Sequence, residues 1–89
     1  MLTSSERRTL KALAHKLEPV VIIGAKGLTD EVVAEIDRAL KAHELIKVRA
    51  AALERDERGA LVDEICGRTG AEQVQNVGKI FVLFRKNDE

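Results

Sequence analysis

The residues of this sequence best suited to binding chemistry are four consecutive ones, Gly24-Ala25-Lys26-Gly27. Two glycines three positions apart let the backbone approach a ligand closely, because neither carries a side chain that would stand in the way. The four residues precede a predicted helix, whose free N–H groups and dipole attract anions, and Lys26 adds a mobile positive charge. The pattern indicates a phosphate-binding loop. The plainer interpretation is a tight turn between a strand and a helix, which needs no ligand.

A second stretch with the same glycine spacing, Gly67-Arg68-Thr69-Gly70, stands in a different predicted setting. It falls at the C-terminal end of a predicted helix, where free carbonyl groups and the negative end of the dipole repel phosphate. Glycine is also the usual residue just beyond a helix end. We therefore interpret this stretch as a helix cap and keep only the first as a candidate ligand site.

Other polar and basic residues could extend the candidate site. Lys47 and Arg49 share one face of a predicted strand, so both would reach a ligand on that side. Basic residues of the predicted first helix would join only if that helix packs beside the loop. Thr29 can cap the helix that follows the loop. The candidate binding residues are Gly24, Ala25, Lys26, Gly27, Thr29, Lys11, Lys16, Lys47 and Arg49.

The residue types that carry catalysis or hold metals are few and scattered. A nucleophile needs a base within reach, and a metal ion needs converging ligands. His15 and His43 fall near predicted helix C-termini, where the dipole favours an imidazolium and a structural role is the plainer interpretation. Cys66 is the only cysteine, so it can form neither an internal disulfide nor a cysteine pair for a metal. We expect no enzymatic activity, metal site, cofactor or small-molecule substrate.

The 89 residues carry 15 basic and 15 acidic side chains, so the formal net charge is zero. The distribution is uneven, because residues 1–29 hold five bases against two acids and residues 30–64 hold six bases against ten acids. A local basic face is sufficient to attract phosphate within a Debye length. No apolar run is long enough to span a membrane, and the N-terminus lacks the apolar segment of a secretory signal. We expect a cytoplasmic protein without membrane contacts.

Apolar periodicity predicts three helices and four strands. The helices are expected over 4–16, from Thr29 to near His43, and around 61–66 with an end at Gly70; the strands are expected over 20–23, 45–50, 71–77 and 79–85. A charged connector is expected over 53–59. The order αβαβαββ predicts one α/β domain over 1–89, a compact two-layer or three-layer sandwich with a four-stranded mixed sheet.

Three stretches of the sequence together resemble a known family. They are Leu13-Ala14-His15-x-Leu17-x-Pro19-Val20-Val21-x-Ile23-Gly24-x-x-Gly27-Leu28-Thr29, then His43-Glu44-Leu45-Ile46-Lys47-Val48-Arg49, and finally Gly78-Lys79 with Val82-Leu83-Phe84-Arg85. The pattern resembles the CRM domain (chloroplast RNA splicing and ribosome maturation), and most closely the bacterial stand-alone YhbY-like proteins. Because it runs in one register over nearly the whole chain, it is far more specific than the glycine spacing alone.

The resemblance implies an RNA-binding domain related in fold to the C-terminal domain of translation initiation factor three. It also implies that the chain associates with ribosomal RNA in precursors of the bacterial large subunit, where ribosomal proteins could be contacted too. The RNA-contacting loop of the family maps onto residues 24–27, and its basic surface onto Lys47 and Arg49. The sequence departs from the family at Phe84, where a tyrosine is common, and in its acidic middle segment, which would narrow the basic surface.

Phe81 and Phe84 are the only aromatic residues, and both are expected in the core of the last strand. The exposed stacking platform of some RNA-binding sheets is therefore not expected, and RNA would be held through its backbone and shape. Two other functions compete with RNA binding. The chain could be an adaptor that docks on a ribosomal protein or assembly factor, or an enzyme whose loop holds a phosphorylated small molecule.

Overall fold

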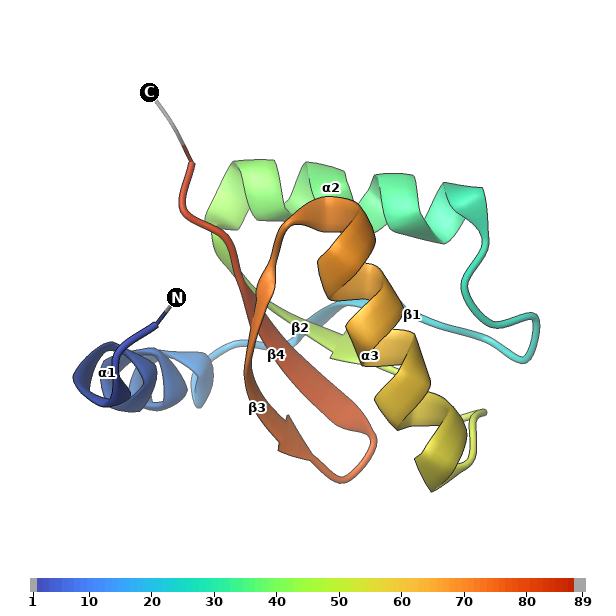
Figure 1. Cartoon of the computed structure of the whole chain (residues 1–89), viewed down its shortest axis with the longest axis horizontal. Coiled ribbons are helices and arrows are strands. Elements are labelled where there is room, and N and C mark those ends of the chain that lie inside the picture. Colours follow the sequence, from blue (N-terminus) through green and yellow to red (C-terminus); the bar gives the residue numbers. More distant parts are fainter. Residues whose placement is uncertain (1, 88–89) are drawn as a thin grey trace.

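The computed structural model describes residues 2–87 and contains three helices and four strands in the order αβαβαββ (Figure 1). The elements are α1 (Ser4–Ala14), β1 (Pro19–Ile22), α2 (Asp30–His43), β2 (Leu45–Arg49), α3 (Arg55–Thr69), β3 (Glu72–Val77) and β4 (Ile80–Phe84). The predicted α/β class and the predicted order of elements are confirmed. Apart from the start of α3, the observed ends lie within two residues of the predicted ones.

The four strands form one mixed sheet in the order β1-β2-β4-β3. β1 runs parallel to β2, and α2 provides the connection between them. β4 is antiparallel to both of its neighbours, β2 and β3. Gly78, with a φ of +59°, lies in the turn between β3 and β4, where a left-handed backbone favours glycine. β1 and β3 are therefore the two edges of the sheet.

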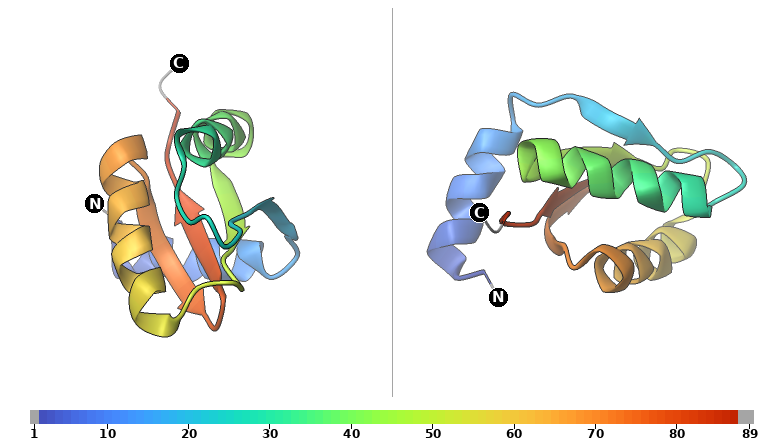
Figure 2. Two further views of the ribbon diagram at one scale, coloured as in Figure 1. Left: turned by 90° about the vertical axis from the view of Figure 1, so that its right-hand side faces the viewer. Right: turned by 90° about the horizontal axis from the view of Figure 1, so that it is seen from above.

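The side chains of β4 show how the layers are built. Phe81 and Leu83 point to one face of the sheet and are fully buried against α2 and α3. Val82 and Phe84 point to the other face, where they pack with Ala14 of α1. The fold therefore has three layers, with α1 on one side of the sheet and α2 and α3 on the other (Figure 2). β4 is therefore apolar on both faces.

α1 covers only one end of its side of the sheet. It packs on β2 and β3, and its apolar partners include Leu45 at the start of β2 and Phe84 at the end of β4. Figures 1 and 2 both place α1 at the end of the molecule opposite the loop of residues 24–27. Much of the sheet surface between α1 and that loop is left without a covering helix.

α1 begins and α3 ends with well-formed caps. Thr3 and Glu6 make a capping box, in which the Thr3 hydroxyl accepts the Glu6 N–H at 3.0 Å and the Glu6 carboxylate accepts the Thr3 N–H at 2.9 Å. These hydrogen bonds lower the pKa of Glu6, and the backbone N–H of Thr3 has the largest effect. At the end of α3, Gly70 adopts a φ of +77° and donates its N–H to the Cys66 carbonyl at 2.9 Å. The second glycine stretch is therefore a C-cap, as predicted.

The predicted connector over 53–59 is wrong in its larger part, because α3 begins at Arg55. Glu54 takes the N-cap position, and its N–H donates to the Glu57 carboxylate at 3.0 Å. Glutamate is not among the usual capping residues, and the segment is dense in charge and contains Gly59. These features are typical of a loop, although the segment forms the exposed first turns of a helix whose later residues enter the core.

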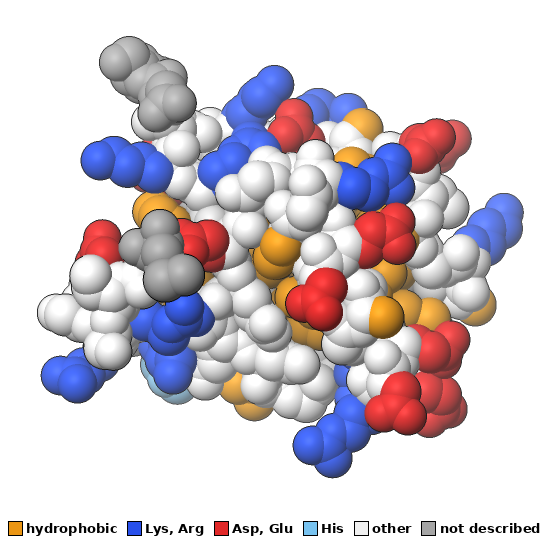
Figure 3. All heavy atoms as spheres, viewed as in Figure 1, with side chains coloured by type: hydrophobic (Ala, Val, Ile, Leu, Met, Phe, Trp, Pro, Cys, Tyr) orange, Lys and Arg blue, Asp and Glu red, His pale blue; other side chains and the backbone are white. Residues whose placement is uncertain are grey.

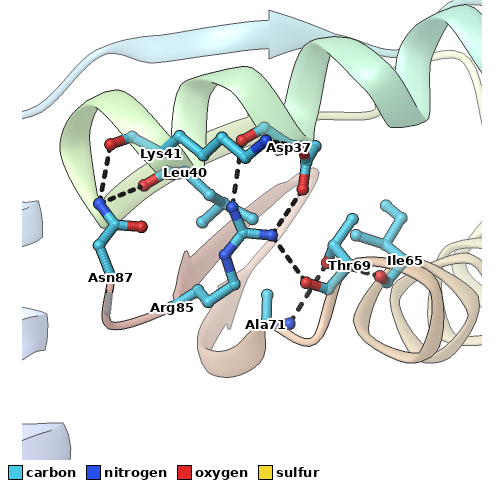
Figure 4. A network of polar contacts seen from close by, with 8 residues as sticks. All are labelled: Asp37, Leu40, Lys41, Ile65, Thr69, Ala71, Arg85 and Asn87. Carbon is cyan, nitrogen blue, oxygen red and sulfur yellow. Dashed lines mark hydrogen bonds and ion pairs between the residues drawn. The ribbon is translucent and has the colours of Figure 1, made fainter. Parts of the chain in front are cut away.

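Arg85, directly after β4, joins the sheet to the middle of α2 and to the end of α3 (Figure 4). Its guanidinium donates to the Asp37 carboxylate at 2.7 Å and to the Thr69 carbonyl, also at 2.7 Å. Two residues later, the side-chain amide of Asn87 donates to the Lys41 carbonyl at 2.7 Å. The hydrogen bond from Arg85 holds the pKa of the Asp37 carboxyl below its ordinary value. This polar clamp satisfies helix carbonyls that α2 and α3 cannot pair internally.

Candidate anion-binding loop and open sheet face

The loop of residues 24–27 is a compact turn that faces solvent. The Gly27 N–H donates to the Gly24 carbonyl at 3.0 Å, and Gly27 has a φ of +75°, which favours glycine at that position. Gly24 has no such requirement, because its φ is not left-handed and no neighbouring atom lies within 4 Å of an added Cβ. The turn therefore requires glycine at position 27 but not at position 24.

The N-terminus of α2 stands next to this loop. Thr29 is the N-cap, and its hydroxyl accepts the Val32 N–H at 3.2 Å, as the sequence predicts. A shallow pocket is lined by the loop together with Thr29, Asp30 and Glu31. Asp30 pairs with Arg68 at 2.8 Å, and this hydrogen bond raises the pKa of Arg68. The helix dipole and Lys26 favour an anion here, but the two carboxylates of the first turn oppose it, so the loop needs additional cations to bind phosphate well.

Lys47 and Arg49 supply cations on the sheet, as the alternation of β2 predicts. Ile46 and Val48 point into the core and are fully buried, which directs Lys47 and Arg49 to the opposite face. The register places Arg49 between Ile22 of β1 and Ile80 of β4. We call this uncovered surface the open face; it is formed by Ile22, Lys47, Arg49, Gln75, Val77 and Ile80.

The basic residues of α1 do not lie beside the loop, since α1 occupies the far end of the sheet (Figures 1 and 2). Lys11 instead lines a shallow pocket on the open face together with Lys47 and His15. Lys16 lies apart, in a groove formed with Leu13 and other residues near the end of α1. The structure therefore groups Lys11 with the sheet cations and separates Lys16 from both the loop and the open face.

Arg7 has a structural contact that sequence reasoning did not anticipate. Its guanidinium donates to the carbonyl of Gln73 and, at 3.2 Å, to the carbonyl of Val74. These two carbonyls lie where the pairing of β3 with β4 shifts register between Gln73 and Gln75. Arg7 therefore anchors α1 to β3 and is not free to bind phosphate. No local pattern signals this role, because it depends on where α1 packs.

Charge is divided between the two sides of the sheet. The open face contains two cations, has Lys11 at its margin, and has no acidic residue among those that form it. The helices on the other side hold most of the acids, and Figure 3 shows red side chains gathered over the beginning of α3. The acids of α2 and α3 are Asp30, Glu31, Glu35, Asp37, Asp56, Glu57, Asp63 and Glu64. A net charge of zero therefore coexists with a cationic face.

The remaining candidates for chemistry occupy structural positions. Cys66 is half-buried against the core, and burial raises the pKa of its thiol, so the thiol stays protonated at neutral pH. Within residues 2–87, no group of three or more His, Cys, Asp or Glu side chains is arranged to hold a metal ion. None of the helices in the same residues is long and apolar enough to cross a membrane.

Fold and site together define a small α/β protein with a glycine-lysine loop at a helix N-terminus and a cationic sheet face beside it. A family model described as the CRS1 / YhbY (CRM) domain matches residues 2–85. The chain belongs to this family, and the resemblance seen in the sequence is confirmed.

Individual relatives agree with this assignment. A Pseudomonas aeruginosa protein named "Probable RNA-binding protein" is 46% identical over 86 residues, which cover 97% of this chain and 83% of that one. A Haemophilus influenzae protein named "RNA-binding protein" is 46% identical over 88 residues, covering 99% of this chain and 89% of that one. The solution structure of a hypothetical protein from Staphylococcus aureus superposes with a TM-score of 0.86 at 34% identity, covering 100% of this chain and 93% of that one.

Proposed function

We propose that this chain is an RNA-binding protein without enzymatic activity, and that it binds structured ribosomal RNA in the large-subunit precursor. RNA binding is supported by the names of its relatives and by the family. The observation that carries the proposal is the position of Arg49. Arg49 lies on the open face next to Ile22, and Ile22 stands two residues before Gly24 in the sequence. The cations of the sheet therefore continue the surface of the loop.

In this proposal the RNA backbone passes over the loop and onto the sheet. Gly24 and Gly27 leave room for a phosphate near the first N–H groups of α2, which the helix cannot pair internally. Lys26, Lys47 and Arg49 then supply charge, offsetting the carboxylates at the start of α2. The assignment to ribosome assembly in the cytoplasm rests on what the family resemblance implies, with ribosomal RNA as ligand and ribosomal proteins as secondary contacts.

Salt dependence of binding tests the role of the cations. Three phosphate contacts predict a slope of about −2.1 to −2.7 in log affinity against log salt, which is roughly a 20- to 40-fold loss between 50 and 200 mM. Lys47→Ala combined with Arg49→Ala should flatten the slope by about 1.4 to 1.8. Arg38→Ala is the matched control, because Arg38 is exposed on α2, which lies on the side of the sheet opposite the open face. A flat salt dependence for the wild type would contradict the proposal.

Gly24→Asp tests the loop without straining the fold, since the position has free space and an ordinary φ. The added carboxylate should weaken RNA binding while the circular dichroism spectrum and melting temperature stay unchanged. Unchanged affinity would exclude the loop from the interface.

The competing function, an adaptor without RNA contact, is tested in cells. Ultraviolet cross-linking followed by sequencing, resolved by ribosomal gradient fraction, should recover ribosomal RNA in fractions of the large-subunit precursor. Protein adducts with almost no RNA would favour the adaptor, whereas RNA in other fractions would keep RNA binding and remove the assembly assignment.

A further inference from the structure

A row of side chains crosses the open face from one edge of the sheet to the other. The register aligns Ile22 of β1 with Arg49 of β2, Arg49 with Ile80 of β4, and Ile80 with Val77 of β3. Paired positions on neighbouring strands project to the same side of the sheet. With strands about 4.8 Å apart, the row spans about 14 Å. It consists of three aliphatic side chains and one arginine.

The two ends of this row are well exposed to solvent. Ile22 is 68% exposed and Val77 is 58% exposed, because α1 packs only on the far end of this face. Ile22 and Val77 stand at opposite ends of the row, with Arg49 and the half-buried Ile80 between them. Several exposed aliphatic side chains on one sheet surface indicate a binding surface more often than a single one does. Among residues 2–87, neither Lys47 nor Arg49 has a side-chain hydrogen bond or an ion pair. The face therefore combines apolar contact area with uncompensated positive charge.

The row is also held in a fixed position relative to the loop. The Ile23 N–H donates to the Arg49 carbonyl at 2.7 Å, so the pairing of β1 with β2 continues to the residue before Gly24. At the end of β2, the Ala50 N–H donates to the Lys79 carbonyl at 2.8 Å, which ties β2 to the turn between β3 and β4. A strand of RNA held at the loop would meet this row next.

The chemistry of the row selects between paired and unpaired RNA. A double helix presents phosphates, 2′-hydroxyls and groove edges, while its base faces are stacked inside. Such a ligand would satisfy Lys47 and Arg49 but leave Ile22, Ile80 and Val77 in contact with polar atoms or water. Unpaired nucleotides present both phosphates and flat, weakly polar base faces.

We propose that the open face binds a short unpaired segment of RNA that continues directly from the backbone held at the loop, with bases resting on Ile22, Ile80 and Val77. This inference rests on the proposed function and specifies its ligand as a junction between paired and unpaired RNA. An acidic peptide with apolar side chains would meet the same surface chemistry. Continuity with the loop favours RNA, and the peptide is an outcome of the test.

The test compares two RNAs in fluorescence anisotropy: a hairpin alone, and the same hairpin with a short single-stranded extension at either end. The extension should tighten wild-type binding by about four- to tenfold, the gain expected from partly burying one or two aliphatic side chains. Ile22→Ser and Val77→Ser should remove most of that gain and leave hairpin affinity unchanged. Leu13→Ser is the matched control, because Leu13 is 56% exposed on α1, away from the row, and should keep the gain.

Failure of this inference differs from failure of RNA binding itself. If the hairpin binds, Gly24→Asp weakens it and neither extension adds affinity, the unpaired segment is wrong and the proposed function stands. If neither RNA binds in a salt-dependent way, the proposed function is wrong and this inference falls with it. If the extension adds nothing, and a labelled acidic, apolar peptide binds the wild type but not Ile22→Ser, the row is a protein-docking surface and the inference is overturned.

Discussion

Replacing Arg85 by alanine should destabilise the protein strongly while leaving its RNA affinity unchanged. Arg85 lies in the motif that the chain shares with CRM domains, so sequence alone suggests a ligand contact as readily as a structural one. In the structure its guanidinium is bound to Asp37 and Thr69 at 2.7 Å each and to the Asp37 carbonyl at 3.3 Å. Its side chain is only 19% exposed, so water would replace these bonds only in part.

The size of the effect follows from the partners. One hydrogen bond joins two charged groups, although Asp37 is itself 35% exposed, and the other two end on helix carbonyls. Together they predict a loss of roughly 2 to 4 kcal/mol from a total stability of about 5 to 15 kcal/mol. The melting temperature should then fall by about 10 to 30 °C. Urea unfolding followed by circular dichroism measures the loss, and fluorescence anisotropy at low temperature measures RNA affinity.

Two further variants make this test specific to the clamp. Arg85→Lys keeps the charge but loses the planar guanidinium that donates to Asp37 and Thr69 together. It should therefore retain only part of the stability that Arg85→Ala loses. Asp37→Ala combined with Arg85→Ala should cost less than the sum of the single changes, because the two residues share a bond. The structural role would be refuted if Arg85→Ala lowered the free energy of unfolding by less than about 1 kcal/mol, or if the effects of the two single changes were fully additive. A loss of RNA affinity in the folded variant would refute it as well.

Four other substitutions have defined outcomes. Asp37→Asn should destabilise the protein near neutral pH, because the folded-state pKa of Asp37 lies below its ordinary value of 3.8. The stability that the Asp37 carboxylate contributes is complete above that value and is lost as pH falls through the folded-state pKa. The acid unfolding curves of the variant and the wild type should therefore converge. Gly27→Ala should lower the free energy of unfolding, measured in urea, by about 1 to 2 kcal/mol, because Gly27 has a φ of +75°. Gly24→Ala should leave the free energy of unfolding unchanged or slightly higher. Thr29→Ala should cost about 1 kcal/mol through loss of the α2 cap, and a thermal melt identical to that of the wild type would contradict this.

Local signals in the sequence predicted much of this fold. Alternation in β2 placed Lys47 and Arg49 opposite the core, and the caps at Thr29 and Gly70 could be predicted because each depends on residues within one turn. The start of α3 was missed since its cap is Glu54, and the first turns expose charged side chains. Local rules fail there because burial of later residues in the helix decides where it begins.

The arrangement of the candidate site could be predicted only in part. Residues 24–27 were found from spacing and from the helix that follows. Lys11 was a candidate on the condition that the first helix packs beside that loop, and it lies instead beside Lys47. The role of Arg7 on β3 and the row from Ile22 to Val77 depend on strand order. Strand order is a property of the whole chain, which no segment encodes by itself.

The two edges of the sheet are built in ways that disfavour the addition of a strand from another chain. A free edge strand is a template onto which another chain can add a strand. β1 is only four residues long and begins with Pro19, which has no N–H to offer. At the opposite edge, Arg7 occupies the carbonyls of Gln73 and Val74 where β3 loses regular register. Both edges are thus poor templates for fibril growth, and truncation of α1, which carries Arg7, should promote aggregation before it affects the core.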